Sequence, residues 1–84
     1  MNDETRSNTQ RRYVEWCADV GRFRQRELVE LGGGSQPSLS RIIRGQPSRL
    51  GVRTSALHAL NALRKKHGLR EVTLAEVCWV WTAE

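Results

Sequence analysis

Apolar residues recur along the first part of this chain with the period of an α-helix. The first apolar stripe has spacings of three and four residues and consists of Tyr13, Trp16, Cys17 and Val20. We expect this helix to start near residues 7–9 and to end at Gly21, because glycine commonly terminates helices. The polar residues 1–8 lack any such period, so we expect a flexible arm there and a folded domain over residues 9–84.

A pair of helices separated by a glycine turn is expected next. The first spans about residues 24–31 and the second follows the three glycines at 32–34. Ser35 suits the N-cap of this second helix, Pro37 suits its first turn, and Gly45 ends it. Its apolar side is formed by Leu39, Ile42 and Ile43, and its polar side by Gln36, Ser38, Ser40, Arg41 and Arg44. One face is therefore suited to a core and the other to a partner.

Two more helices complete the predicted all-α fold. The fourth spans about residues 54–67, with leucine and alanine on its buried side and Gly68 at its end. A capping-box pattern over residues 73–76 favours a fifth helix from Leu74 to about Trp81. Alternating apolar residues leave a strand open as the alternative for this last segment.

The predicted helical domain carries an excess of positive charge. With 84 residues the chain makes one small domain, and its formal net charge is +5. Residues 22–53 contain seven arginines and only two acidic residues, Glu27 and Glu30. Such a cluster favours a polyanionic partner, although a solvated basic surface is the alternative.

The sequence gives little support for a metal site, a catalytic site, or a secreted or membrane location. The two cysteines and two histidines lack the spacing of a zinc site, so we expect no metal and no cofactor. No catalytic triad, paired carboxylates or phosphate-binding glycine loop is present, so we expect no enzyme and see no small-molecule ligand. Without a signal-peptide core or a membrane-length apolar run, the expected location is the cytoplasm.

The segment Gln25-Arg26-Glu27-Leu28-Val29-Glu30-Leu31-Gly32-Gly33-Gly34-Ser35-Gln36-Pro37-Ser38-Leu39-Ser40-Arg41-Ile42-Ile43-Arg44-Gly45 resembles the helix-turn-helix of the lambda-repressor-like family. That family includes phage repressors, Cro proteins and Xre-type regulators, and the resemblance covers about residues 9–81. It implies a compact five-helix DNA-binding domain with residues 35–44 as the recognition helix. The sequence departs from the family pattern at Val29, Gly32, Gly34 and Pro37.

The resemblance also implies residues that contact DNA. Those assigned to bases are Gln36, Ser38, Ser40 and Arg41. Those assigned to the DNA backbone are Arg24, Gln25, Arg26, Arg44, Arg49 and Arg53. Glutamine can make paired hydrogen bonds to adenine, and arginine can make them to guanine. In the family, a glutamine at the position of Gln25 holds a phosphate and braces the glutamine at the position of Gln36.

These features predict a sequence-specific transcriptional regulator of phage or prophage type that acts by occupying an operator in double-stranded DNA. A domain of this size covers little DNA, so we expect a homodimer. The apolar residues Trp79, Val80 and Trp81 are its candidate contact, unless the tryptophans only close the core. Alternative functions are a protein-interaction adaptor or antitoxin-like module, and an excisionase-type architectural DNA-binding protein.

Overall fold

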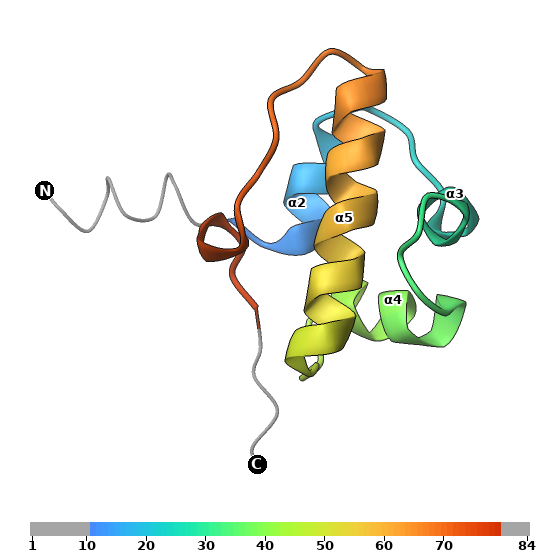
Figure 1. The fold of residues 1–84 in the computed structure, drawn as a ribbon, viewed down its shortest axis with the longest axis vertical. Coiled ribbons are helices and arrows are strands. Elements are labelled where there is room, and N and C mark those ends of the chain that lie inside the picture. The colour runs from blue at the N-terminus through green and yellow to red at the C-terminus, as the bar shows by residue number, and fades with distance from the viewer. Residues whose placement is uncertain (1–10, 80–84) are drawn as a thin grey trace, which may run out of the picture.

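The computed structural model describes residues 11–79 of the chain as an all-helical globule. Within that range it contains four α-helices, one short 3-10 helix and no β-strand. In chain order these elements are α2 (Tyr13–Ala18), α3 (Gln25–Glu30), α4 (Gln36–Ile43), α5 (Leu50–Lys66) and η1 (Leu74–Glu76). The long helix α5 stands at the centre and contacts each of the other elements (Figure 1). The prediction of an all-α fold is confirmed.

The core forms where the apolar stripes of the four helices meet. Every helix contributes at least one residue with almost no exposed surface. The buried hydrophobic residues within the helices are Tyr13, Trp16, Cys17, Leu28, Leu39, Ile42, Ala56, Ala59, Leu60 and Leu63. These are the positions that the helical period predicts as inward-facing. None of the helices in the described range is long and apolar enough to cross a membrane.

The glycine turn joins α3 to α4, and glycine is required there both for backbone conformation and for close packing. Gly32 and Gly34 have φ angles of +100° and +89°, in the left-handed region that side chains rarely adopt. Gly33 is buried, and a Cβ there would lie only 2.8 Å from the carbonyl oxygen of Leu28. That Cβ would also lie 3.1 Å from the Cβ of Ala59 in α5. The absence of a side chain at Gly33 therefore allows α3, α4 and α5 to pack closely.

Helix α2 is fixed to α5 by a buried arginine. The guanidinium of Arg64 forms an ion pair of 2.8 Å with Asp19 and donates a hydrogen bond of 3.1 Å to the backbone oxygen of Trp16. Arg11 donates to both carboxylate oxygens of Asp19, each at 2.9 Å. Hydrogen bonds from Arg11 and Arg64 lower the pKa of Asp19 below its ordinary value, although partial burial opposes them. Asp19 is therefore ionised and structural.

The ends of the predicted helices differ from the structure in two places. Arg11 pairs with Val77 in an isolated parallel bridge and Arg12 is the N-cap of α2, so the helix that contains Tyr13 starts at that residue, later than predicted. Residues 1–10, including the predicted arm, lie outside the described residues. Helix α5 starts at Leu50, four residues before its predicted start, and includes Gly51 in its first turn.

The predicted fifth helix from Leu74 to about Trp81 is wrong over its described part. The capping box is present, since the backbone amide of Thr73 donates to the Glu76 carboxylate at 2.9 Å, but it supports only the single turn η1. The chain then becomes extended, and the amide of Cys78 donates to the backbone oxygen of Arg11 at 2.7 Å. Backbone bonds to a distant segment replace those that would have continued the helix.

Candidate nucleic-acid interface

Helix α4 presents a polar face opposite the face that it buries. Leu39 and Ile42 point into the core and have little or no exposed surface. At 3.6 residues per turn, Gln36, Ser40 and Arg44 form one row along the opposite side, with Arg41 beside it. Gln36, Arg41 and Arg44 are exposed, and Ser40 is half-buried. One short helix therefore carries both an anchored side and a side available to a partner.

The start of α4 is fixed by hydrogen bonds of its own. The side-chain oxygen of Ser35 accepts from the backbone amide of Ser38 at 3.3 Å, as expected of an N-cap. The Ser35 hydroxyl also donates to the Ser38 hydroxyl at 2.9 Å. Ser38 is half-buried at the edge of the polar face, so its hydroxyl belongs first to the cap. Gln36, the next residue after the cap, is free to project outward.

Most basic residues of the described range fall into two groups; of the others, Arg26 and Lys66 form exposed ion pairs with glutamates, and Arg53 is buried. In the first group, Arg11, Arg64 and Arg70 surround Trp16, with guanidinium carbons 4.6, 5.1 and 5.5 Å from the centre of its ring. Each of these arginines also has a carboxylate partner in Asp19 or Glu76. The hydrogen bond from Arg70 lowers the pKa of Glu76 to about 2. Each guanidinium of this group therefore has a carboxylate partner, and two of the three positive charges are balanced locally.

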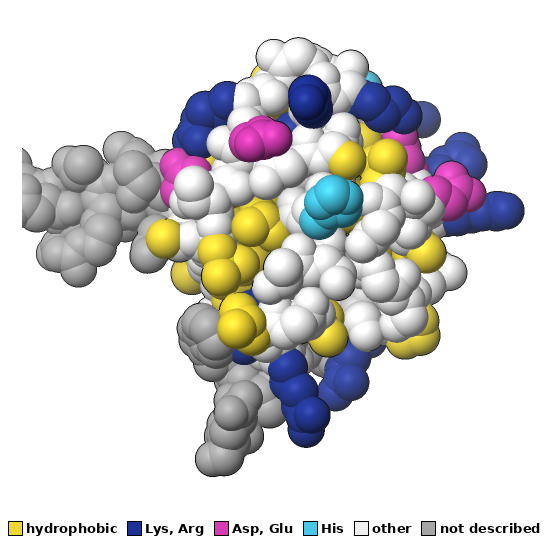
Figure 2. Space-filling model, in the orientation of Figure 1, with side chains coloured by type: hydrophobic (Ala, Val, Ile, Leu, Met, Phe, Trp, Pro, Cys, Tyr) yellow, Lys and Arg dark blue, Asp and Glu magenta, His cyan; other side chains and the backbone are white. Residues whose placement is uncertain are grey.

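The second group is exposed and has no ion-pair partner within residues 11–79. Its members are Arg12, Arg22, Arg24, Arg41, Arg44, Arg49 and Lys65. Arg41 and Arg44 belong to α4, and Arg49 precedes the first residue of α5. Blue side chains project from the lower end of the molecule, where α4 and the start of α5 lie, and no magenta is visible beside them in this view (Figure 2). A surface with unpaired cations lies at this end.

The residues at α3 that were predicted to contact the DNA backbone differ in their exposure and in their partners. Arg24 precedes α3, is exposed and has no carboxylate partner within the described range. Arg26 lies 3.5 Å from Glu30 in an exposed pair, which holds its side chain only weakly. Gln25, the first residue of α3, is half-buried, and no hydrogen bond connects it to Gln36 among the described residues. The bracing contact implied by the resemblance is not formed in this structure.

Arg53 is a correction to the predicted set of backbone contacts. Its side chain is fully buried, with 0% of its surface exposed, on the inner side of α5. The guanidinium donates from Nε to the backbone oxygen of Ser48 at 3.1 Å and donates to the same oxygen from a second nitrogen. A phosphate outside the protein cannot reach it. Arg53 instead fixes the loop between α4 and α5.

Arg12 is a candidate that the sequence did not indicate. It is the N-cap residue of α2, far in sequence from the helix-turn-helix. One of its guanidinium nitrogens lies 3.4 Å from the point where a Cβ of Gly45 would stand, so the side chain lies against the end of α4. Packing of α2 on α4 brings Arg12 beside Gly45 at the end of α4, and no local motif could have shown that.

Only one of the three residues predicted to form a dimer contact, Trp79, lies within the described range. Trp79 is half-buried against the core, with its ring centre 5.7 Å from that of Tyr13. Its Nε1 donates to the backbone oxygen of Leu74 at 2.9 Å. Trp79 therefore has an intramolecular packing role, which was the alternative to a dimer contact. Val80 and Trp81 lie outside the described residues.

The described residues offer no metal site, and Cys17 offers no reactive thiol. No group of histidine, cysteine or acidic side chains within residues 11–79 could hold a metal ion. Burial raises the pKa of the Cys17 thiol to about 12, so this cysteine is unsuited to nucleophilic chemistry. Comparison of the chain with protein-family models, curated proteins and solved structures finds no match.

Proposed function

We propose that this protein is a sequence-specific DNA-binding regulator of the lambda-repressor-like type, with α4 as the helix that enters the major groove. The observation that carries the proposal is the division of the basic residues. Those near Trp16 are paired with carboxylates, whereas Arg41, Arg44 and Arg49 around α4 are exposed and have no ion-pair partner among residues 11–79. Keeping several arginines unpaired beside one another costs electrostatic repulsion, which a polyanion would relieve.

The order of residues along α4 suits a division between base and backbone contacts. Gln36 is exposed at the start of the helix, where the amino-terminal residues of a recognition helix meet base edges. Arg41 lies beside the same row and can donate two hydrogen bonds to guanine. Arg44 at the end of the helix and Arg49 beyond the loop suit the phosphates on either side of the groove.

The buried face of α4 supports this assignment in a second way. A helix that reads DNA must hold its position, because a misplaced donor loses its hydrogen bond to a base. Leu39 and Ile42 anchor α4 in the core, and Gly33 allows it to approach α5 closely. Arg53 fixes the loop that follows α4 through the backbone oxygen of Ser48. The reading face is thus carried on a rigid support.

A small domain of this kind would bind an operator as two copies. A single module of this size buries only about 600–1,000 Å² on DNA, so two half-sites would raise both affinity and specificity. Occupation of an operator by such a dimer would block transcription without any ligand or catalytic domain. The alternative is a protein adaptor that presents the same basic face to an acidic protein.

The charge assignment can be tested with one pair of matched variants. We expect Arg44→Ala to weaken binding to a fluorescent random-sequence duplex and to reduce the slope of log affinity against log salt by about one. Lys65→Ala removes the same charge from an exposed position that has no ion-pair partner among residues 11–79 and lies about 20 Å along α5 from its start; it should change neither quantity appreciably. Equal effects of the two substitutions, or no binding to duplex DNA at all, would contradict the proposal.

A further inference from the structure

The outward side of α5 carries no formal charge over about three turns. Between Leu50 and Leu63 the only arginine, lysine or acidic residue is Arg53, and its side chain is buried. Residues on this side of the helix recur at spacings of three and four and are exposed or half-buried. They are Leu50, Gly51, Thr54, Leu57, His58 and Asn61, and together they are called the uncharged face.

The uncharged face stands out from the rest of the surface. In Figure 1 α5 lies in front of α2, and Figure 2 shows the surface from the same side. Over the middle of α5 this surface is white and yellow with histidine in cyan, whereas dark blue and magenta lie around its margin (Figure 2). Among residues 11–79, Leu50 is the large hydrophobic residue left most exposed, at 54%. Depletion of charge around an exposed apolar side chain is characteristic of the centre of a protein–protein interface.

Two polar side chains of the uncharged face are already hydrogen-bonded within the protein. Thr54 donates from Oγ1 to the backbone oxygen of Leu50 at 2.9 Å. The side-chain nitrogen of Asn61 donates to the backbone oxygen of Val72 at 2.9 Å, and its side-chain oxygen accepts from the Val72 amide at 2.7 Å. A partner that covers these groups therefore displaces few hydrogen bonds to water, which lowers the cost of burying them.

We propose that the uncharged face is the surface through which two copies of this chain meet. A second copy has the same formal net charge of +5, so contact through the basic surfaces would bring like charges together. The uncharged face avoids this repulsion. It also presents no lysine or arginine to an acidic protein or a nucleic acid, so its composition favours a second copy over either of them.

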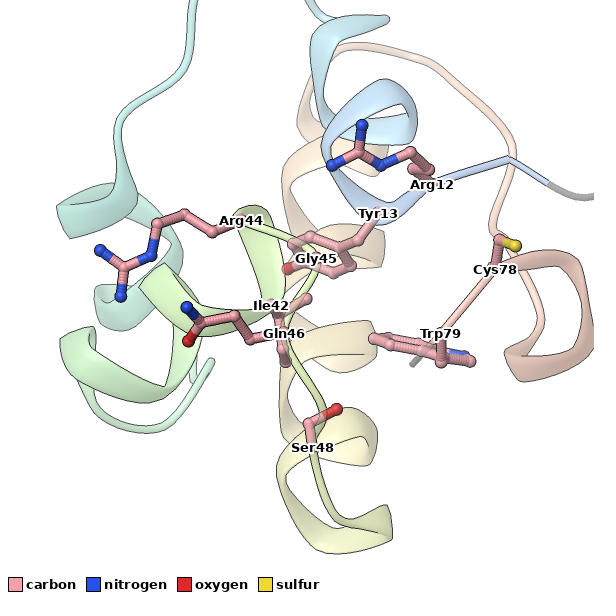
Figure 3. A pocket seen from close by; sticks show the side chains of 9 residues that line it. All are labelled: Arg12, Tyr13, Ile42, Arg44, Gly45, Gln46, Ser48, Cys78 and Trp79. Carbon is pink, nitrogen blue, oxygen red and sulfur yellow. The ribbon is translucent and has the colours of Figure 1, made fainter. Parts of the chain in front are cut away.

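The pocket of about 300 Å³ between α2, α4 and the segment after η1 is less suited to self-association. Figure 3 shows Arg12 and Arg44 extending in different directions from the margin of this pocket. Both are exposed, and neither has an ion-pair partner among residues 11–79. Two copies meeting there would bring their guanidinium groups close together without a carboxylate between them.

The direction of α5 suits a dimer that reads two half-sites, and this consequence rests on the proposed function. Helix α4 packs on α5 and lies towards one end of it (Figure 1). A two-fold axis parallel to α5 would place α4 of both copies at the same end of the dimer, where both could face one duplex. The two α5 helices would then run parallel to each other.

The small size of the uncharged face implies weak self-association without DNA. Residues 50–61 span about 17 Å at 1.5 Å per residue, and a helix is about 10–12 Å wide. A contact of this size buries well below the ~800 Å² per partner that is typical of a stable interface. We expect a dissociation constant of about 0.1–1 mM. Two half-sites on one duplex would supply the high local concentration that such a contact needs.

Self-association can be measured on the full chain without DNA, so failure of this proposal is separable from failure of the proposed function. We would record amide spectra of the ¹⁵N-labelled protein from about 20 µM to 2 mM at near-physiological salt. Concentration-dependent shifts should centre on Leu50, Thr54 and His58. Over the same range, sedimentation equilibrium should show the average mass rising from 9.6 kDa towards twice that value.

Matched variants decide whether the uncharged face is responsible. Thr54→Lys places a charge within this face and should weaken self-association at least about tenfold, while Leu50→Ala should weaken it about fivefold. Ala18→Lys adds the same charge at an exposed position of α2 and should have no such effect. All three positions are exposed, so folding is expected to persist and is checked by circular dichroism. No concentration dependence up to about 2 mM, shifts centred outside α5, or equal effects of the two lysines would each overturn the proposal.

Discussion

Replacing Gly33 by alanine should destabilise the protein, although the same change usually stabilises an exposed helix. A Cβ at Gly33 would lie 2.8 Å from both the backbone oxygen of Leu28 and Cδ1 of Leu39, and 3.1 Å from the Cβ of Ala59. A backbone oxygen and a buried methyl group cannot move aside cheaply, because three helices meet there. Overpacking of this kind costs about 1–3 kcal/mol, whereas the smaller entropy of the unfolded chain returns about 0.4–1 kcal/mol.

The net loss for Gly33→Ala is about 1–2 kcal/mol, which lowers Tm by roughly 5–15 °C in a domain of this size. Gly51→Ala is the matched control, since its Cβ would meet no heavy atom within 4 Å and its φ is not positive. That variant should gain up to about 1 kcal/mol. Thermal and urea unfolding followed by tryptophan fluorescence would compare the two. Equal shifts for both variants, or no loss at Gly33, would refute the steric reasoning.

Two further predictions concern pH and thiol chemistry. Because Arg11 and Arg70 lower the folded-state pKa values of Asp19 and Glu76, the stability these carboxylates contribute is complete above their unfolded pKa values near 4. For Glu76 it should be lost as pH falls towards about 2, and for Asp19 as pH falls through its lowered pKa, so the urea midpoint should fall on acidification. Asp19→Asn should flatten that dependence; an unchanged slope would argue against it. Exposed Cys78 should react quickly with iodoacetamide at about pH 8, whereas buried Cys17 should react only after unfolding; rapid labelling of both thiols by mass spectrometry would contradict this.

The helical faces could be predicted from the sequence because local periodicity alone determines them. Tyr13, Trp16 and Cys17 repeat at helical spacing, and the structure buries all three. The same reasoning placed Leu39 and Ile42 on the inner side of α4. Where one face of a helix supplies the core, the sequence pattern is sufficient.

The remaining features depend on contacts between distant segments. The capping box at Thr73 favoured a helix, but backbone bonds to Arg11 drew the chain into an extended path after one turn. The charge of Arg53 indicated a surface residue, yet its guanidinium is held inside by the backbone oxygen of Ser48. Arg12 reaches α4 only because α2 packs against it. None of these outcomes is encoded by local spacing.

Selection of bound duplexes from a random DNA pool at near-physiological salt would show whether the protein reads a DNA sequence. An enriched inverted repeat is expected, and Arg41→Ala should relax the preference at one or two base pairs at a cost of about 1–3 kcal/mol. An enriched site without symmetry would retain the DNA reader and remove the symmetric dimer. No enrichment over the starting pool would contradict sequence-specific DNA binding.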